Sequence, residues 1–133
     1  MLRTLALSLC LFITTATAAE PVFDVHVHLR DGETSLRDYR ETVRAAGLEL
    51  SGIGVMWFGG PHQARQGDLA KIRAGNDRVI VLAGAHADAV PIATVHPYDG
   101  DAALAGLARV AAAGVKVLEI HPHTQGFDVG RPR

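Results

Sequence analysis

The segment Asp24-Val25-His26-Val27-His28 carries the clearest chemical signal in this chain. Alternate side chains of a β-strand point to the same face, so Asp24, His26 and His28 are expected on one face. Neighbours on that face lie about 7 Å apart, twice the ~3.3 Å rise per residue. Two imidazoles at this spacing can converge on one ion, since metal–nitrogen bonds measure about 2.0–2.1 Å. The pattern predicts His26 and His28 as metal ligands; two strand histidines without an ion are the alternative.

Strand alternation also predicts which face the neighbouring side chains lie on. Val25 and Val27, with their neighbours Phe23 and Leu29, are expected on the opposite face, packed against helices. Asp24, behind His26, is expected to orient a ligating histidine. Imidazole ligands favour zinc, iron, nickel or manganese over calcium or magnesium. The two histidines therefore predict one of these four transition metals.

Strand-like and helix-like segments alternate along the rest of the chain. Period-2 apolar runs rich in β-branched residues predict strands over residues 22–29, 53–58, 90–96 and 115–120. Capping residues and apolar spacing predict a helix from Thr34 or Ser35 to Gly47, a loop at 62–75, a helix over 76–87, and a helix from Asp99 or Asp101 to Gly114. This order predicts an α/β fold with a parallel sheet and right-handed crossovers.

Composition excludes several classes of protein. The chain has 133 residues, of which 48% are hydrophobic and 20% charged, as in ordinary globular proteins. Its 13 Lys+Arg against 14 Asp+Glu argue against a nucleic-acid partner. One cysteine excludes an internal disulfide and a cysteine-rich zinc site. Neither GxGxxG after the first strand nor GxxxxGK[ST] is present, so nucleotide binding has no support.

Residues 1–18 have the pattern of a secretory signal peptide. Arg3 precedes the apolar run from Leu5 to Ile13, and Ala16-Thr17-Ala18 forms a small-residue cleavage site. The apolar run is shorter than the ~20 residues that span a bilayer. We therefore expect a secreted or periplasmic protein without a membrane span, with residues 19–133 as its one domain. A buried N-terminal strand or helix is the alternative.

Three segments together resemble the amidohydrolase superfamily. They are DVHVH at 24–28, PIATVHP at 91–97 and GVKVLEIHPHTQGFD at 114–128. They are most similar to the amidohydrolase-related branch, also called amidohydrolase 2, which includes metal-dependent hydrolases and decarboxylases. The resemblance implies a (β/α)8 TIM barrel with a divalent metal at its mouth, and His26 and His28 match the first two ligands. We expect one metal ion, and zinc is the expected metal. The resemblance also implies a hydrolase in which metal-activated water attacks a carbonyl-type small-molecule substrate; a decarboxylase is the alternative.

The length of the chain departs from that family. Such a barrel has eight strands in typically ~250 residues, and this chain supplies four strands. The family's later ligands, a histidine after each of strands five and six and an aspartate after strand eight, have no counterpart. We expect the N-terminal half of a barrel, partnered by a second copy or by a complementing half-barrel. A catalytically inactive fragment with an open sheet edge is the competing interpretation.

Other residues near strand ends are weaker candidates. His121 ends the fourth strand on the face of Glu119, which lies one layer deeper, and is a candidate for substrate contact or proton transfer. A histidine that caps the backbone is the alternative, and the same choice applies to His96 after the third strand. Lys116 lies on the other face, so a carboxylated lysine bridging two metals is not expected. Surface or loop positions are expected for His62, His86 and His123, and a core or pocket position for Trp57.

A third class of protein shares part of the histidine pattern. His26-x-His28-x4-Glu33 resembles the HxHx3–4E motif of cupins, which bind metal in an antiparallel all-β fold. The helical patterns after Ser35 and Asp101 oppose that fold. The parallel α/β interpretation is therefore preferred.

Overall fold

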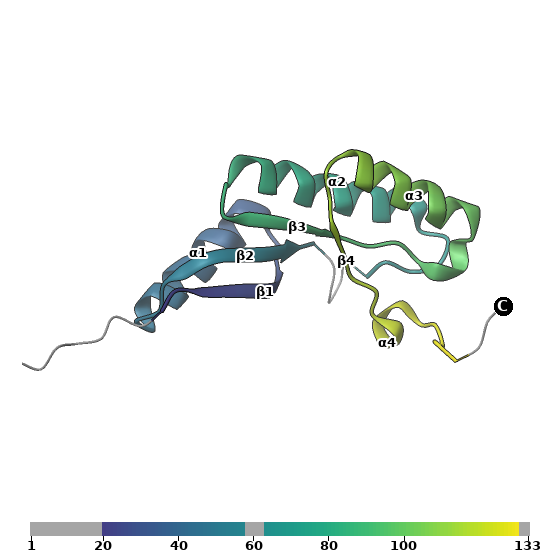
Figure 1. The fold of residues 1–133 in the computed structure, drawn as a ribbon. Helices are drawn as coiled ribbons and strands as arrows, with labels where there is room; N and C mark the ends of the chain where they lie inside the picture. Colours follow the sequence, from purple (N-terminus) through teal and green to yellow (C-terminus); the bar gives the residue numbers. More distant parts are fainter. Residues whose placement is uncertain (1–19, 58–62, 131–133) are drawn as a thin grey trace, which may run out of the picture.

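Four parallel strands form one curled sheet in the computed structural model of the chain (Figure 1). The structure describes residues 20–57 and 63–130, so the expected signal peptide and His62 lie outside the described residues. The strands lie in chain order: β1 (Val22–His28), β2 (Leu50–Met56), β3 (Ala89–Ala93) and β4 (Val117–Leu118). Between and after them come α1 (Gly32–Ala45), α2 (Leu69–Ala85), the short 3-10 helix η1 (Pro97–Asp99), α3 (Asp101–Ala112) and α4 (Pro122–Gln125). The expected α/β partial barrel is confirmed.

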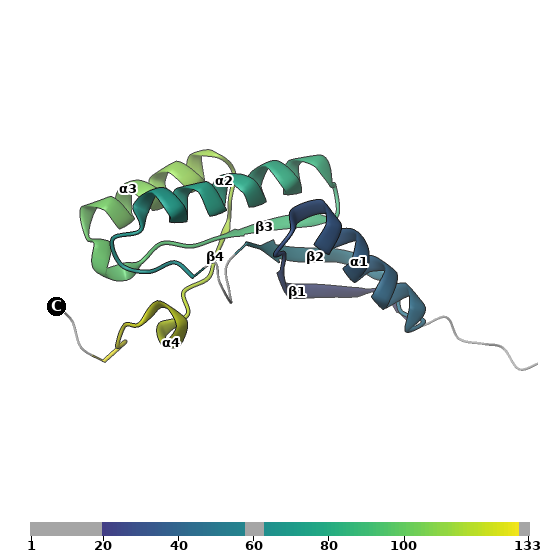
Figure 2. The ribbon, with the colours of Figure 1, turned by 180° about the vertical axis from the view of Figure 1, so that it is seen from behind.

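One contact between the two edge strands shows that the sheet is curled. Strands spaced ~4.8 Å apart would place β1 and β4 about 14 Å from each other in a flat four-stranded sheet. In the structure, His26 Nε2 of β1 lies 3.7 Å from Glu119 Oε2, one residue beyond β4. The sheet is therefore concave on the face that carries these two side chains. Figures 1 and 2 show α1, α2 and α3 together on the opposite, convex side.

The hydrophobic core lies between the convex face and these helices. Val27 and Leu29 of the first strand segment pack there with α1 and α2 side chains. The larger cluster consists of Val27, Leu29, Leu36, Ile53, Val55, Val79, Leu82 and Ala83. A second cluster joins Ala93 of β3 to Val110 and Val115 around α3. Because Val27 and Leu29 point into this core, the alternating His26 and His28 point to the concave face.

A β-bulge in β1 breaks the expected alternation before His26. Asp24 lies opposite Ile53 and Val27 opposite Val55, so three steps along β1 match two along β2. An extra residue of this kind bends the strand, and the side chains before it point to the opposite face from the one that simple alternation predicts. Asp24 consequently lies on the convex side, where the Tyr39 hydroxyl of α1 donates a hydrogen bond to its carboxylate. The expectation that Asp24 shares a face with the two histidines is wrong.

The same bulge corrects the expectation for Phe23 and Val25. These side chains are 46% and 69% exposed and do not pack into the core under the helices. Gly54 of β2 makes room for the bulge, because a Cβ there would lie 2.6 Å from the Val25 carbonyl oxygen. Asp24 Oδ1 accepts a hydrogen bond from the His26 backbone N–H at 3.0 Å, and this bond stabilises the bulged backbone between the two residues.

Several element boundaries also differ from the expectations. Helix α2 begins at Leu69, inside the run expected as a loop, and Asn76 lies within it instead of capping it. The buried Asn76 amide bonds the backbone carbonyl and N–H of Thr94, at 2.8 and 3.0 Å, so its polarity tethers α2 to the end of β3. Helix α1 begins at Gly32, before Thr34 and Ser35. After β4, Pro122–Gln125 form the short helix α4, which the sequence pattern does not predict.

Candidate metal centre

His26, His28 and Glu119 converge on the concave face, at the carboxyl ends of β1 and β4. The Nε2 atoms of His26 and His28 are 2.8 Å apart, and His26 Nε2 lies 3.7 Å from Glu119 Oε2. One ligand atom from each residue falls within 4.8 Å of the other two. The two rings tilt by 59° with centroids 4.8 Å apart, so their nitrogens meet edge to edge and the rings do not stack.

This group fits a small divalent cation. In a tetrahedral site with bonds of ~2.1 Å, ligand atoms are about 3.4 Å apart. The His26–Glu119 distance of 3.7 Å is close to that value, and the histidine nitrogens, 2.8 Å apart, need to separate by about 0.6 Å. Two imidazoles and one carboxylate are a ligand set found in catalytic zinc sites, where a fourth position stays open. The His26–His28–Glu119 group could therefore hold a metal ion.

The group is open to solvent. The His26 side chain is 51% exposed and that of Glu119 is 23% exposed, while His28 is also an exposed residue. A water or a small molecule can therefore reach an ion held by these side chains without any movement of the fold. This exposure also distinguishes the two histidines from the buried His96.

Glu119 is the functional candidate that the sequence pattern did not assign to the metal. Alternation correctly placed it on the interior face, but one layer deeper than His121. The missing information was the curl of the sheet, which carries the end of β4 to within 3.7 Å of His26. A carboxylate at the end of the fourth strand, together with an expected barrel, was the available signal.

A hydrogen-bonded pair supports His26 from the convex side. The Tyr39 hydroxyl donates to Asp24, whose other oxygen accepts the His26 backbone N–H. Burial, reinforced by the hydrogen bond to Asp24, raises the pKa of Tyr39 to about 12. Asp24 thus still acts on His26, but through the backbone instead of the imidazole.

His121 lies outside the group formed by His26, His28 and Glu119, the metal group. Its Nδ1 accepts the Thr124 backbone N–H at 3.3 Å and caps α4, and its own backbone N–H donates to Gln125 Oε1 at 2.8 Å. The ring is exposed. Among the described residues, it does not belong to the group that could hold a metal. The structure therefore shows the capping contact that was its alternative role.

His96 is held entirely by the backbone around it. It is 1% exposed; Nδ1 accepts the Tyr98 backbone N–H at 3.2 Å, and Nε2 donates to the Gln125 carbonyl at 3.0 Å. Rings of Tyr98 and Phe127 lie 5.7 and 5.8 Å away. Both nitrogens are therefore used in joining β3 to the segment around α4.

The remaining candidates lie away from the metal group. His86, at the end of α2, bonds the Glu33 carboxylate at 2.9 Å and contacts Arg40, and His123 is exposed. Trp57 is partly buried beneath the Arg78 guanidinium, 4.8 Å from its ring centre. Lys116 is exposed.

Comparison of the chain with protein-family models, with curated proteins and with solved structures found no match. Within the described parts of the chain, no helix combines the length and the apolarity needed to cross a membrane.

Proposed function

We propose that this chain is the N-terminal half of a metal-dependent hydrolase related to the amidohydrolase superfamily, with one zinc held by His26, His28 and Glu119. The observation that carries the proposal is the meeting of these three ligand atoms within 4.8 Å across the concave face. Active sites of β/α barrels form at the carboxyl ends of the strands, where this group lies. The pattern of residues 1–18 adds the proposal that the protein acts in the periplasm or outside the cell.

Each ligand residue has a separate task in this proposal. His26 and His28 supply neutral imidazole nitrogens, and Glu119 supplies an anionic oxygen that offsets part of the charge of a divalent ion. When bound, zinc lowers the pKa of a coordinated water towards ~7 and polarises a carbonyl group. A carbonyl carbon polarised in this way is the atom that the water would attack, so the proposal includes a small carbonyl-containing substrate.

Zinc titration of the full chain tests the metal centre. We expect one zinc per chain, with affinity reduced at least ~100-fold by His26→Ala or His28→Ala and about 10-fold or more by Glu119→Gln. His123→Ala and Glu41→Gln are matched controls, because both residues are exposed and lie outside the group. Unchanged zinc affinity in His26→Ala and His28→Ala would refute the assignment.

A separate assay tests the reaction. The zinc-loaded chain is offered a panel of small esters, lactones and amides, after chelation and again after zinc is restored. We expect hydrolysis that follows zinc content and is lost in the three ligand variants. Release of carbon dioxide from aromatic carboxylates, without hydrolysis, would support the decarboxylase instead. Zinc binding with neither activity would overturn the proposed reaction and leave the metal centre standing.

A further inference from the structure

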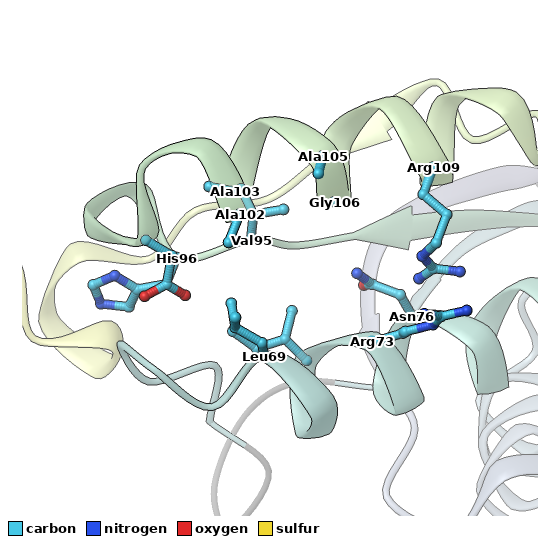
Figure 3. Close-up of a pocket in the computed structure, with 12 residues that line it drawn as sticks. Leu69, Arg73, Asn76, Val95, His96, Ala102, Ala103, Ala105, Gly106 and Arg109 are labelled. Atoms are coloured by element: carbon cyan, nitrogen blue, oxygen red, sulfur yellow. The ribbon is translucent and has the colours of Figure 1, made fainter.

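A cavity that includes none of the proposed metal ligands lies between α2 and α3 (Figure 3). Its volume is about 230 Å³. Leu69 and Ile72 of α2 form one wall, and small residues of α3, including Ala102 and Gly106, form the other. The small side chains of α3 leave open the space that larger residues would fill between two packed helices. The cavity thus arises from the sequence of α3.

The polar groups that line this cavity are satisfied by protein partners, with one exception. The paired groups are Asn76 with Thr94, His96 with Tyr98 and Gln125, and Arg73 and Arg109 with Asp77. Asp99 Oδ1 accepts the Gly67 backbone N–H at 2.8 Å. Asp99 Oδ2 is buried and has no hydrogen-bond partner among the described residues. A buried carboxylate oxygen without a donor is costly, so this atom marks a missing partner.

We propose that this cavity binds a small organic ammonium ion, with its charged nitrogen on Asp99 Oδ2 and its apolar body between α2 and α3. The ionised carboxylate accepts and never donates hydrogen bonds, and its bonds to cations are stronger than those to neutral donors. An apolar cavity of ~150 Å³ accommodates benzene, so about 230 Å³ suits a single ring with a short aminoalkyl arm. This inference does not depend on the proposed metal centre.

The charges along the cavity favour one orientation of the ligand. Asp99 follows His96 in η1, and its backbone N–H bonds the His96 carbonyl at 3.1 Å. Figure 3 shows Arg73 and Arg109 at the end of the cavity away from His96. The ammonium group therefore lies at the His96 end, far from these two cations. His96 offers no competing acceptor there, because both of its ring nitrogens are already bonded.

Titration of the full chain with benzylamine, followed by backbone amide NMR shifts, tests this site at neutral pH. Benzyl alcohol, of similar shape without the charge, is the matched probe. We expect saturable shifts around Val95, Ala103 and Gly106, and about tenfold weaker binding of the alcohol. Asp99→Asn keeps an acceptor for Gly67 and should reduce benzylamine binding about tenfold, to the level of the alcohol.

Two further variants separate a specific site from general charge attraction. Asp101→Asn removes the same charge from an exposed position in the first turn of α3 and should leave benzylamine binding unchanged. Ala102→Leu should fill the cavity and prevent binding of both probes, with folding checked by circular dichroism. Equal binding of the two probes, an equal loss in Asp101→Asn and Asp99→Asn, or shifts confined to other surfaces would each overturn the proposal.

Discussion

The carboxyl ends of β1 and β3 both carry histidine, with opposite results. At β1, the His26 side chain is 51% exposed and its Nε2 meets His28 and Glu119. At β3, His96 is 1% exposed and both ring nitrogens bond backbone groups. The first arrangement brings side-chain nitrogens and a carboxylate oxygen together at one point, and the second uses both ring nitrogens to hold the fold together.

The difference arises from where the chain goes after each strand. After β1 the chain passes to α1 on the convex side, and the His26 side chain on the concave face remains 51% exposed. Three residues beyond β3 the chain enters η1, and the segment around α4 returns beside it, which brings the Tyr98 N–H and the Gln125 carbonyl to the His96 ring. A histidine at a strand end can serve as a metal ligand only where the following backbone does not already bond both of its ring nitrogens.

Alanine substitution should destabilise the chain strongly at His96 and hardly at all at His26. The His96→Ala effect is the largest change in stability that we expect. His96→Ala removes the partner of the buried Gln125 carbonyl and of the half-buried Tyr98 N–H and leaves a cavity, so we expect a loss of about 3 kcal/mol in the free energy of unfolding. His26→Ala, at an exposed position, should change it by less than ~0.5 kcal/mol. Urea unfolding, followed by circular dichroism, measures both.

Zinc titration of the same two variants sharpens the comparison. His96→Ala should keep the zinc affinity of the native chain under conditions where it is folded, whereas His26→Ala should lose it. A large destabilisation by His26→Ala would show that His26 belongs to the core. Lost zinc binding in folded His96→Ala would show that the two strand ends are coupled, against the separation described above.

Substitution of Gly54 tests whether the bulge in β1 sets the direction of the His26 side chain. Gly54→Ala places a Cβ 2.6 Å from the Val25 carbonyl, a backbone atom that cannot move alone. We expect a loss of about 2 kcal/mol in unfolding free energy, with weaker zinc binding because β1 must shift. Gly84→Ala in α2, whose Cβ meets open space, is the matched control and should stabilise the chain by about 0.5–1 kcal/mol. Equal effects of the two substitutions would contradict this account of the bulge.

The sequence predicted the parts of this molecule that depend on local pattern. Period-2 alternation and β-branched residues located β1 and placed His26 and His28 together, and the alternation of strands and helices gave the half-barrel. Asp24 was assigned to the wrong face because the bulge depends on Gly54, in a different strand. Local alternation cannot reveal a residue that the neighbouring strand determines.

Two other errors also involved contacts between distant segments. Glu119 was not linked to the metal because its approach to His26 requires the whole sheet to curl. Asn76 was interpreted as a helix cap because a free asparagine favours caps, whereas its amide here bonds Thr94, eighteen residues further on. The start of α2 was missed with it, since exposed polar residues such as Lys71 and Arg73 resemble a loop.

The smallest expected effect concerns the support that His26 receives from the convex side. Tyr39→Phe removes the donor to Asp24, and we expect a loss of about 1 kcal/mol in unfolding free energy at neutral pH. Zinc affinity should fall by less than about tenfold, because the His26 N–H still bonds Asp24. The effect stays below that of Gly54→Ala, since the backbone path of β1 is retained.

The pH dependence of this effect has a definite sign. The pKa of Tyr39 is raised in the folded chain from 10.0 to about 12, so the folded state holds the phenolic proton more tightly than the unfolded state. Its stabilisation is complete below pH 10 and is lost as the pH rises through about 12. Urea unfolding across that window should show native stability falling towards that of Tyr39→Phe. If the two proteins instead lose stability in parallel, the Tyr39–Asp24 bond does not hold β1 in place.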